Sequence, residues 1–158
     1  MARRTLADDI NKRSPFDAAE QEAYLNILRT EDILTSDFSR LFREHGLSEP
    51  LYNALRIVRG CGADGVPSQA IADDMVKRHP DVTRLVDRLV ERGLVRRVRS
   101  ETDRRVVRIC VTPTGRRTLD RLDQEVLELH RRQLGHMPAD RLRLLNDLLV
   151  EARAGCSR

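Results

Sequence analysis

The sequence contains no tryptophan, only 3% aromatic residues and only three cysteines among its 158 residues. With so few rings, the hydrophobic core must consist mainly of leucine, valine, isoleucine and alanine, a composition that favours helices. The three cysteines, Cys61, Cys110 and Cys156, are too few and too irregularly spaced for a disulfide framework or a zinc site. This pattern is typical of a protein from a reducing compartment.

Long hydrophobic runs are also absent from the sequence. The longest uninterrupted apolar run is three residues, whereas a helix that spans a bilayer needs about 20. The N-terminal stretch MARRTLADDINKR lacks the apolar segment of a signal peptide, so we expect a cytoplasmic protein without a membrane segment. Hydrophobic residues make up 40% of the chain, which is enough for one packed domain, or for one small domain with helical extensions.

Positive charge is concentrated in the middle of the chain. Residues 66–117 carry 13 basic and 7 acidic side chains, whereas residues 1–47 carry 7 and 9, and the two remaining segments are each neutral. A basic block within a neutral or acidic frame is typical of a surface that binds a polyanion. The alternative is a solvated arginine-rich surface, because 27 of the 29 basic residues are arginine.

Hydrophobic spacing predicts four helices before residue 94. Ser14 as N-cap and Pro15 at the first helical position open one long helix, or two stacked helices, that end at residues 45–46. A second helix starts at residues 48–50 and ends at the GCGADG segment, and Ser68 caps a short third helix. The fourth helix, residues 80–93, has a complete apolar stripe formed by Val82, Leu85, Val86, Leu89 and Val90.

After residue 93 the hydrophobic period changes to two, which predicts a β-hairpin with strands at residues 94–99 and 106–111. The segment SETD forms the turn between these strands. On the second strand we expect alternate residues to face the core and the solvent, with Val107, Ile109 and Val111 on the core face and Val106, Arg108 and Cys110 on the solvent face.

Two further helices follow the hairpin. Thr112 and Pro113 cap and open the first of them, residues 135–138 break it, and residues 140–152 form the last helix. The terminal helices carry more apolar faces than one small domain can bury, so a second copy of the chain is the expected partner. The first dozen residues and the final AGCSR are expected to be frayed.

The order of elements in the centre predicts a winged helix-turn-helix. Two helices joined by a short turn, followed by a hairpin, match that motif, and six arginines lie between residues 96 and 109 of the hairpin. Arginines on such a wing can reach phosphates or the minor groove beside the major groove that the recognition helix enters. The predicted fold is therefore mainly α with a small β-hairpin wing.

Two runs of the sequence resemble the MarR family of bacterial transcriptional regulators. They are DVTRLVDRLVERGLVRR, residues 81–97, and DRRVVRICVTPTGRRTL, residues 103–119. In that family a helix similar to VTRLVDRL precedes a G-L-V-x-R strand, a D-x-R wing and an L-T-x-x-G helix start. The resemblance is close over residues 48–122. One departure is the segment KRHPDVTR, which stands where a small capping residue usually ends the turn before the recognition helix.

The resemblance implies three regions and a homodimer. Residues 1–47 form an N-terminal dimerisation region, residues 48–112 the winged helix-turn-helix, and residues 113–158 the C-terminal dimerisation helices. It implies a sequence-specific regulator of transcription, most often a repressor, that binds an inverted-repeat operator in double-stranded DNA. A twofold dimer places its two recognition helices in successive major grooves about 34–36 Å apart.

The candidate DNA-binding residues lie on three elements. Thr83 and Arg84 begin the recognition helix and are expected at base edges, while Asp81 either accepts from a cytosine amino group or caps the helix. Arg88 is expected at the DNA backbone, or paired with an acidic neighbour. Phosphate contacts are expected from Ser68 and Gln69 at a helix N-terminus and from Arg97 and Arg99 on the wing. By the resemblance, Asp103 and Arg105 match the D-x-R of the wing, so Arg105 is expected to be braced near the base or tip of the wing, and Arg104 or Arg105 to enter the minor groove.

Control of the regulator is less defined by the sequence. Members of the family commonly bind small aromatic or phenolic molecules between the dimerisation helices and the winged helix, and the residues that could line such a cleft here are Phe38, Phe42, His45, Tyr52 and Arg56. The rival mechanism is a redox switch at a cysteine such as Cys110, although an inert thiol is the simpler interpretation.

The sequence contains no motif that indicates another class of function. The four histidines form no spaced set with other ligands, so we expect no metal site and no cofactor. No nucleophile elbow, phosphate-binding glycine loop or H-E-x-x-H motif is present, so we expect no enzyme. A winged helix used for protein contacts would need an apolar recognition face, whereas the exposed side here is charged.

Overall fold

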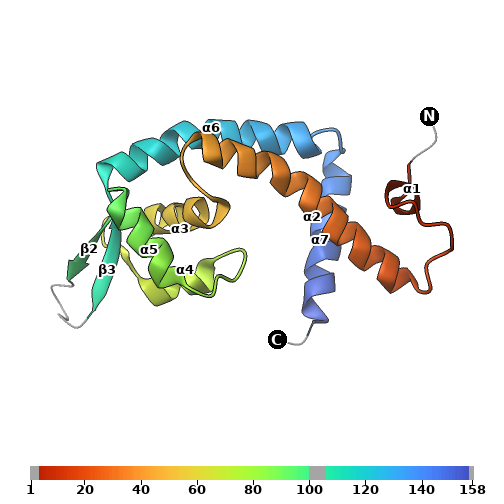
Figure 1. The fold of residues 1–158 in the computed structure, drawn as a ribbon, viewed down its shortest axis with the longest axis horizontal. Helices are drawn as coiled ribbons and strands as arrows, with labels where there is room; N and C mark the ends of the chain where they lie inside the picture. Colours follow the sequence, from red (N-terminus) through yellow and green to blue (C-terminus); the bar gives the residue numbers. More distant parts are fainter. Residues whose placement is uncertain (1–3, 100–105, 157–158) are drawn as a thin grey trace. The chain divides into compact units, whose positions relative to one another are not determined.

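The computed structural model describes residues 4–99 and 106–156. The contacts divide the chain into two units, Met1–Tyr52 and Asn53–Arg158. The N-terminal unit holds two helices, α1 (Leu6–Asp9) and α2 (Ala19–Glu44), and the first turn of α3 (Glu49–Gly60). The remaining elements are β1 (Val66–Pro67), α4 (Ser68–Asp74), α5 (Val82–Glu91), β2 (Val95–Arg99), β3 (Val107–Val111), α6 (Pro113–Leu134) and α7 (Ala139–Ala154) (Figure 1).

The expectation of a frayed N-terminus was wrong, because residues 6–9 form helix α1. Thr5 and Asp8 form a capping box: the Thr5 amide donates to Asp8 Oδ2 at 2.8 Å, and the Asp8 amide donates to Thr5 Oγ1 at 3.3 Å. The hydrogen bonds that the Thr5 amide and the Thr5 hydroxyl donate to Asp8 Oδ2, at 2.8 and 2.7 Å, lower the pKa of the exposed Asp8 carboxyl. Their stabilisation is therefore present above the ordinary pKa of aspartate and is lost as the pH falls through the lowered value.

Helix α2 is one 26-residue helix, but it begins later than the sequence predicts. The predicted cap Ser14 accepts a hydrogen bond from the Lys12 side chain at 3.1 Å instead of from a helical amide. The actual N-cap is Ala18, whose methyl group has no hydrogen-bonding atom. The predicted end is confirmed: the Leu47 amide donates to the Phe42 carbonyl at 2.7 Å, which closes the last turn in a Schellman motif.

The winged-helix region contains a three-stranded antiparallel sheet in the order β1-β3-β2. The predicted hairpin is formed by β2 and β3, with Val98 opposite Arg108. Strand β1, which the sequence analysis missed, pairs with the other edge of β3 and places Val66 opposite Ile109. A strand of two residues that includes Pro67 has no hydrophobic period, so only the tertiary pairing defines it.

The core lies beneath the recognition helix and the sheet. Four of the five predicted stripe residues of α5 are buried, and Val90 is half-buried. Leu89 and Val86 are fully enclosed, and the other large side chains that are fully buried come from α3, α4, the strands and α6, namely Leu55, Val58, Ile71, Val95, Ile109, Leu119 and Leu122. Burying an aliphatic side chain contributes about 1.5–3 kcal/mol, so this cluster holds α5 firmly in place.

The predicted faces of β3 are partly wrong. Val107, expected in the core, is 42% exposed, whereas Cys110, expected at the solvent face, is only 7% exposed. Cys110 is buried because the segment that leads into β1 lies against this part of β3. A Cβ atom built on Gly65 would lie 2.5 Å from Cys110 Sγ, so the backbone at Gly65 packs directly against that thiol.

Helices α6 and α7 begin close to the predicted residues. Thr112 caps α6 by accepting from the Gly115 amide at 3.0 Å, and Pro113 is its first residue. A Cβ atom on Gly115 would lie 2.1 Å from the Leu94 carbonyl oxygen, so this position lies tightly against the start of β2. Within the described residues, α7 buries none of its side chains, and three of its aliphatic residues are more than half exposed: Leu144, Leu148 and Val150.

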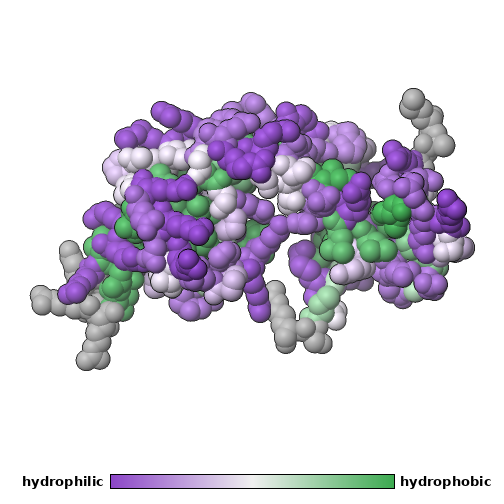
Figure 2. Space-filling model, in the orientation of Figure 1, coloured by the Kyte–Doolittle hydropathy of each residue, from purple (hydrophilic) through white to green (hydrophobic). Residues whose placement is uncertain are grey.

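The fold is therefore mainly α with a small antiparallel sheet, as the sequence predicts, and the hairpin that follows α5 forms the predicted wing. On the face shown in Figure 2, hydrophilic residues dominate, and hydrophobic residues reach the surface in separate groups. None of the helices in the described ranges is long and apolar enough to cross a membrane.

Candidate nucleic-acid interface

Recognition helix α5 presents a polar side because its apolar stripe faces inward. Asp81 is its N-cap, and the Asp81 carboxylate accepts from the Arg84 amide at 3.0 Å. Of the two roles predicted for Asp81, the structure therefore has the capping role. Thr83, Arg84 and Arg88 are exposed, and the Arg84 side chain keeps 75% of its surface accessible. The 3.8 Å ion pair between Arg84 and Asp81 is solvent-exposed and of little energetic value.

An ion pair joins the recognition helix to the wing. Arg97 on β2 donates to Asp87 on α5 at 2.6 Å, with both side chains about 40% exposed. The sequence analysis offered Asp87 only as one possible acidic partner of Arg88 and missed this contact. The pair engages the guanidinium of Arg97, so its predicted phosphate contact would use its other N–H groups or require the pair to open. It also links the hairpin to α5.

A second wing arginine has a structural role. Arg108 on β3 donates to the carbonyl oxygens of Asp64 and Gly65 at 2.7 and 3.1 Å. These bonds hold the loop before β1 against the sheet. Of the wing arginines that the structure describes, Arg96 and Arg99 are exposed and make no ion pair with another described residue. The predicted wing-tip residues Asp103, Arg104 and Arg105 lie outside the described residues.

The predicted phosphate site at the start of α4 lacks the expected serine cap. The N-cap is Pro67 rather than Ser68, which is the first residue of the helix, so the predicted capping role of Ser68 was wrong. The Gln69 side-chain amide donates to Asp73 one turn later at 3.1 Å. Phosphate contacts by Ser68 and Gln69 stay predictions.

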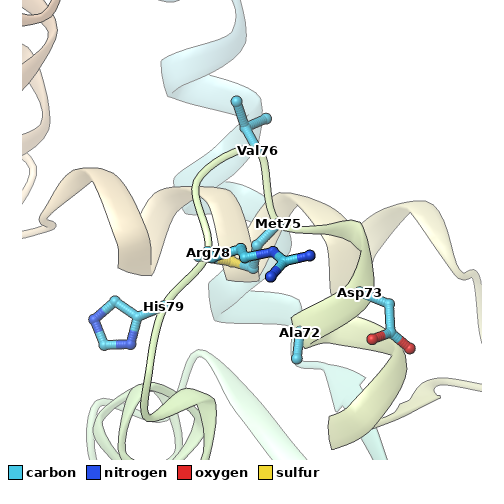
Figure 3. Close-up of a pocket in the computed structure, with 6 residues that line it drawn as sticks. All are labelled: Ala72, Asp73, Met75, Val76, Arg78 and His79. Carbon is cyan, nitrogen blue, oxygen red and sulfur yellow. The ribbon is translucent and has the colours of Figure 1, made fainter. Parts of the chain in front are cut away.

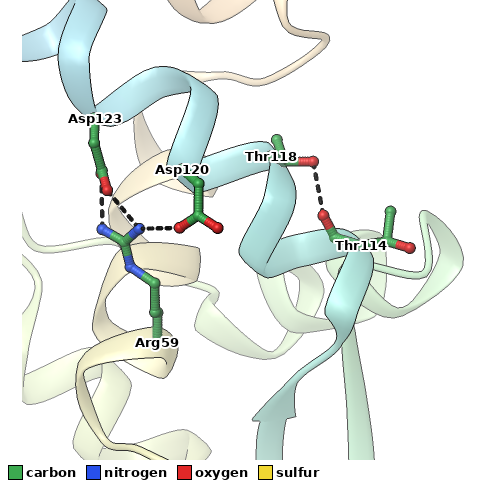
Figure 4. Close-up of polar contacts among 5 residues, drawn as sticks. All are labelled: Arg59, Thr114, Thr118, Asp120 and Asp123. Carbon is green, nitrogen blue, oxygen red and sulfur yellow. Dashed lines mark hydrogen bonds and ion pairs between the residues drawn. The ribbon is translucent and has the colours of Figure 1, made fainter.

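An ion-pair cluster attaches α3 to α6 at the base of the winged helix. Arg59 makes two hydrogen bonds to Asp123, at 2.7 and 2.8 Å, and a third to Asp120 at 3.3 Å (Figure 4). The Arg59 side chain is 22% exposed, so the bidentate pair is partly shielded from water. No local sequence pattern predicts this pair, because Arg59 and Asp123 are 64 residues apart.

Three of the five predicted ligand-binding residues form an aromatic row. Phe42 stacks on Tyr52 with ring centroids 4.3 Å apart, and Phe38 lies 5.9 Å from Phe42 in a tilted arrangement. Phe42 is 3% exposed, so it is part of the core of the N-terminal unit. His45 is the C-cap of α2 and is half-buried, and Arg56 is exposed and donates to Asn53 at 3.2 Å. Ligand binding by these residues stays a prediction.

None of the three cysteines forms a disulfide. Cys110 is a free, buried thiol, so the prediction that it is accessible for a redox switch was wrong. Cys61 and Cys156 are exposed. Over residues 4–99 and 106–156, no group of three or more metal-ligating side chains comes together.

These features together define a winged helix-turn-helix protein. A short helix, a turn, a capped helix with outward-facing threonine and arginines, and an antiparallel wing follow one another in the order that the class requires. Comparison with known proteins places the chain within the class. The family model described as MarR family matches residues 47–107.

The solved structure of a MarR transcription factor from Planctomyces limnophilus is 41% identical in sequence, with a TM-score of 0.65, over 85% of this chain and 98% of that one. CouR from Rhodococcus jostii RHA1, solved with p-coumaroyl-CoA bound, is 25% identical with a TM-score of 0.74, over 90% of this chain and 99% of that one. The transcriptional repressor IacR of Pseudomonas putida is 24% identical over 123 residues, which are 78% of this chain and 72% of IacR.

The chain belongs to the MarR family. It is a transcriptional regulator and not an enzyme, as the sequence predicts. The resemblance drawn from residues 81–97 and 103–119 is confirmed, and so is the winged-helix fold.

Proposed function

We propose that this regulator binds specific sequences in double-stranded DNA through α5 and the wing. The observation that carries the proposal is the polar side of α5. Thr83, Arg84 and Arg88 face solvent on a helix whose opposite side is anchored in the core, and neither Thr83 nor Arg88 bonds to another described side chain. Rigid placement of a few side chains in the major groove is what base readout requires.

Each candidate residue receives a role from its position. Thr83 and Arg84 contact base edges, since they lie in the first turn of α5, and a bidentate Arg–guanine pair contributes about 1–3 kcal/mol of discrimination. Arg88 contacts the DNA backbone. Further phosphate contacts come from Ser68, Gln69, Arg97 and Arg99, and Arg104 or Arg105 enters the minor groove.

The regulator acts as a homodimer on an inverted repeat. Helix α7 leaves aliphatic side chains exposed, and α2 exposes Tyr24, Ile27, Leu28 and Ile33, each at 45% or more. An exposed apolar surface of this kind is typical of an interface. In this proposal residues 1–47 and 113–158 form the dimer, and residues 48–112 bind the DNA.

Fluorescence anisotropy tests the DNA-binding role. The labelled duplex is the region upstream of the protein's own gene, and the competitor is a duplex of the same composition in scrambled order. We expect tight, salt-sensitive binding to the upstream duplex, and a loss of discrimination in Arg84→Ala. Equal, weak binding to both duplexes would contradict the proposal.

Sedimentation and footprinting test the dimer. We expect a dimer at micromolar concentration, and two protected patches centred about 10 base pairs apart on one face of the duplex. Only monomers in solution, together with a single protected patch, would refute the twofold arrangement.

We further propose that the regulator represses transcription and that a small aromatic ligand releases it from DNA. The repressor IacR and the CouR complex with p-coumaroyl-CoA support this, as does the aromatic row of Phe38, Phe42 and Tyr52. Titration of the protein–DNA complex with p-coumarate and p-coumaroyl-CoA tests it, with loss of anisotropy as the expected result. Transcription from the upstream promoter in vitro should fall when the protein is added, and a rise would identify an activator.

A further inference from the structure

The turn between α4 and the recognition helix borders an open cavity of about 680 Å³ (Figure 3). Its lining comes from the end of α4 and from the turn: Ala72, Asp73, Met75, Val76, Arg78 and His79. Met75 is 8% exposed and belongs to the core, whereas Val76 is 80% exposed and lies at the open side. The cavity therefore combines a fixed apolar wall with polar groups that solvent can reach.

Arg78 is the one lining residue that brings positive charge without a partner among the described residues. Its guanidinium is exposed and makes no hydrogen bond or ion pair with any of them. The acidic lining residue Asp73, in contrast, accepts a hydrogen bond from the Gln69 side chain at 3.1 Å. An arginine that is left unpaired beside a cavity can form charge-assisted hydrogen bonds with an anion.

His79 connects the cavity to the start of the recognition helix. Its Nδ1 accepts a hydrogen bond from the Asp81 amide at 3.3 Å, so the neutral ring carries its hydrogen on Nε2. Asp81 in turn caps α5 through the Arg84 amide. A group bound to His79 Nε2 is therefore held at a fixed position relative to Thr83 and Arg84.

We propose that this cavity takes one backbone phosphate of the DNA, next to the bases that α5 reads. His79 donates a hydrogen bond from Nε2, and Arg78, whose exposed side chain extends away from His79 in Figure 3, turns toward the same phosphate and supplies the positive charge. The first turn of a recognition helix approaches the base edges, so the chain just before it runs along the DNA backbone. The volume left over holds ordered water, as protein–DNA interfaces commonly do. The inference rests on the proposed DNA-binding function and adds Arg78 and His79 to its contacts.

The size of the effect follows from counterion release. Each neutralised phosphate contributes about 0.9 to the slope of log affinity against log salt. A dimer that loses one contact in each subunit therefore binds with a slope shallower by about 1.8. If the variant and the unmodified protein bind equally at 1 M salt, this difference in slope corresponds to about a 30-fold lower affinity of the variant at 0.15 M salt.

A scan with neutral methylphosphonate linkages along one half-site of the duplex tests the proposal. For the unmodified protein, one linkage beside the bases read by α5 should weaken binding. For Arg78→Ala the same linkage should have no further effect, because the charge that it faced is gone. His79→Phe, which keeps the ring but removes both nitrogens, should show a reduced penalty at the same linkage. Thermal melts of each variant check folding.

The outcomes separate this inference from the function on which it rests. Suppose that the unmodified protein binds specifically, and that Arg78→Ala has the same salt slope and the same loss of affinity at every methylphosphonate. The phosphate site is then refuted, whereas the proposed DNA-binding function is not. The phosphate site for DNA is also refuted if Arg78 binds inorganic phosphate in the free protein but Arg78→Ala binds DNA as the unmodified protein does. If the unmodified protein discriminates no sequence at all, both proposals fall.

Discussion

Replacing Gly65 with alanine should destabilise the winged helix more than the same change at Gly62. Both glycines have a positive φ, +67° and +74°, so alanine at either position costs about 1–2 kcal/mol of backbone strain. At Gly62 no atom lies within 4 Å of the added Cβ, so strain is the whole cost. At Gly65 the added Cβ would lie 2.5 Å from Cys110 Sγ and 2.6 Å from the Ile109 carbonyl oxygen, so β1 must also shift away from β3.

Overpacking of this kind adds about 1–3 kcal/mol, so we expect Gly65→Ala to cost about 2–5 kcal/mol in all. That is a large part of the roughly 5–15 kcal/mol that stabilises a typical domain. Urea denaturation followed by circular dichroism measures both variants, and Gly62→Ala is the matched control. Equal losses of unfolding free energy in the two variants would refute the close packing of β1 against β3.

Two other predictions concern the base of the winged helix and the thiols. Arg59→Ala removes the bidentate contact to Asp123 and should lower the unfolding free energy by about 1–2 kcal/mol, since the arginine is mostly shielded while the aspartate is half exposed. An unchanged urea midpoint would contradict a stabilising role of the contact between Arg59 and Asp123. A thiol reagent such as Ellman's should label Cys61 and Cys156 rapidly. Cys110 should react only after unfolding, because the segment that leads into β1 covers its thiol. Fast reaction of all three thiols in the native protein would show that this segment moves away from β3.

The sequence predicted the elements whose signals are local. The stripe from Val82 to Leu89 defined α5 to within two residues of its observed bounds, and Thr112 with Pro113 marked the first turn of α6. Both signals depend on residues within one or two helical turns. Ser14 followed by Pro15 carried the same kind of signal but was misleading. The Ser14 hydroxyl accepts a hydrogen bond from the Lys12 side chain, and α2 starts at Ala19.

The elements and contacts that were missed depend on residues far apart in the chain. Strand β1 exists only because Val66 pairs with Ile109, and that pairing buries Cys110, which the alternation of β3 alone places at the surface. The same limit applies to the site. The sequence identified the exposed arginines of α5 and the wing, but Asp87 has Arg97 as its partner only because the sheet brings β2 next to α5.

The central claim, that α5 reads DNA sequence, is tested most directly by selection from a pool of random duplexes with the unmodified protein and with Arg84→Ala. The account predicts that the unmodified protein enriches an inverted repeat whose half-site centres lie about 10 base pairs apart. Arg84→Ala should lose preference at one position of each half-site and keep the others, because a single bidentate contact to guanine is removed. A pool that stays random after repeated rounds, or an enriched sequence that Arg84→Ala selects unchanged, would contradict it.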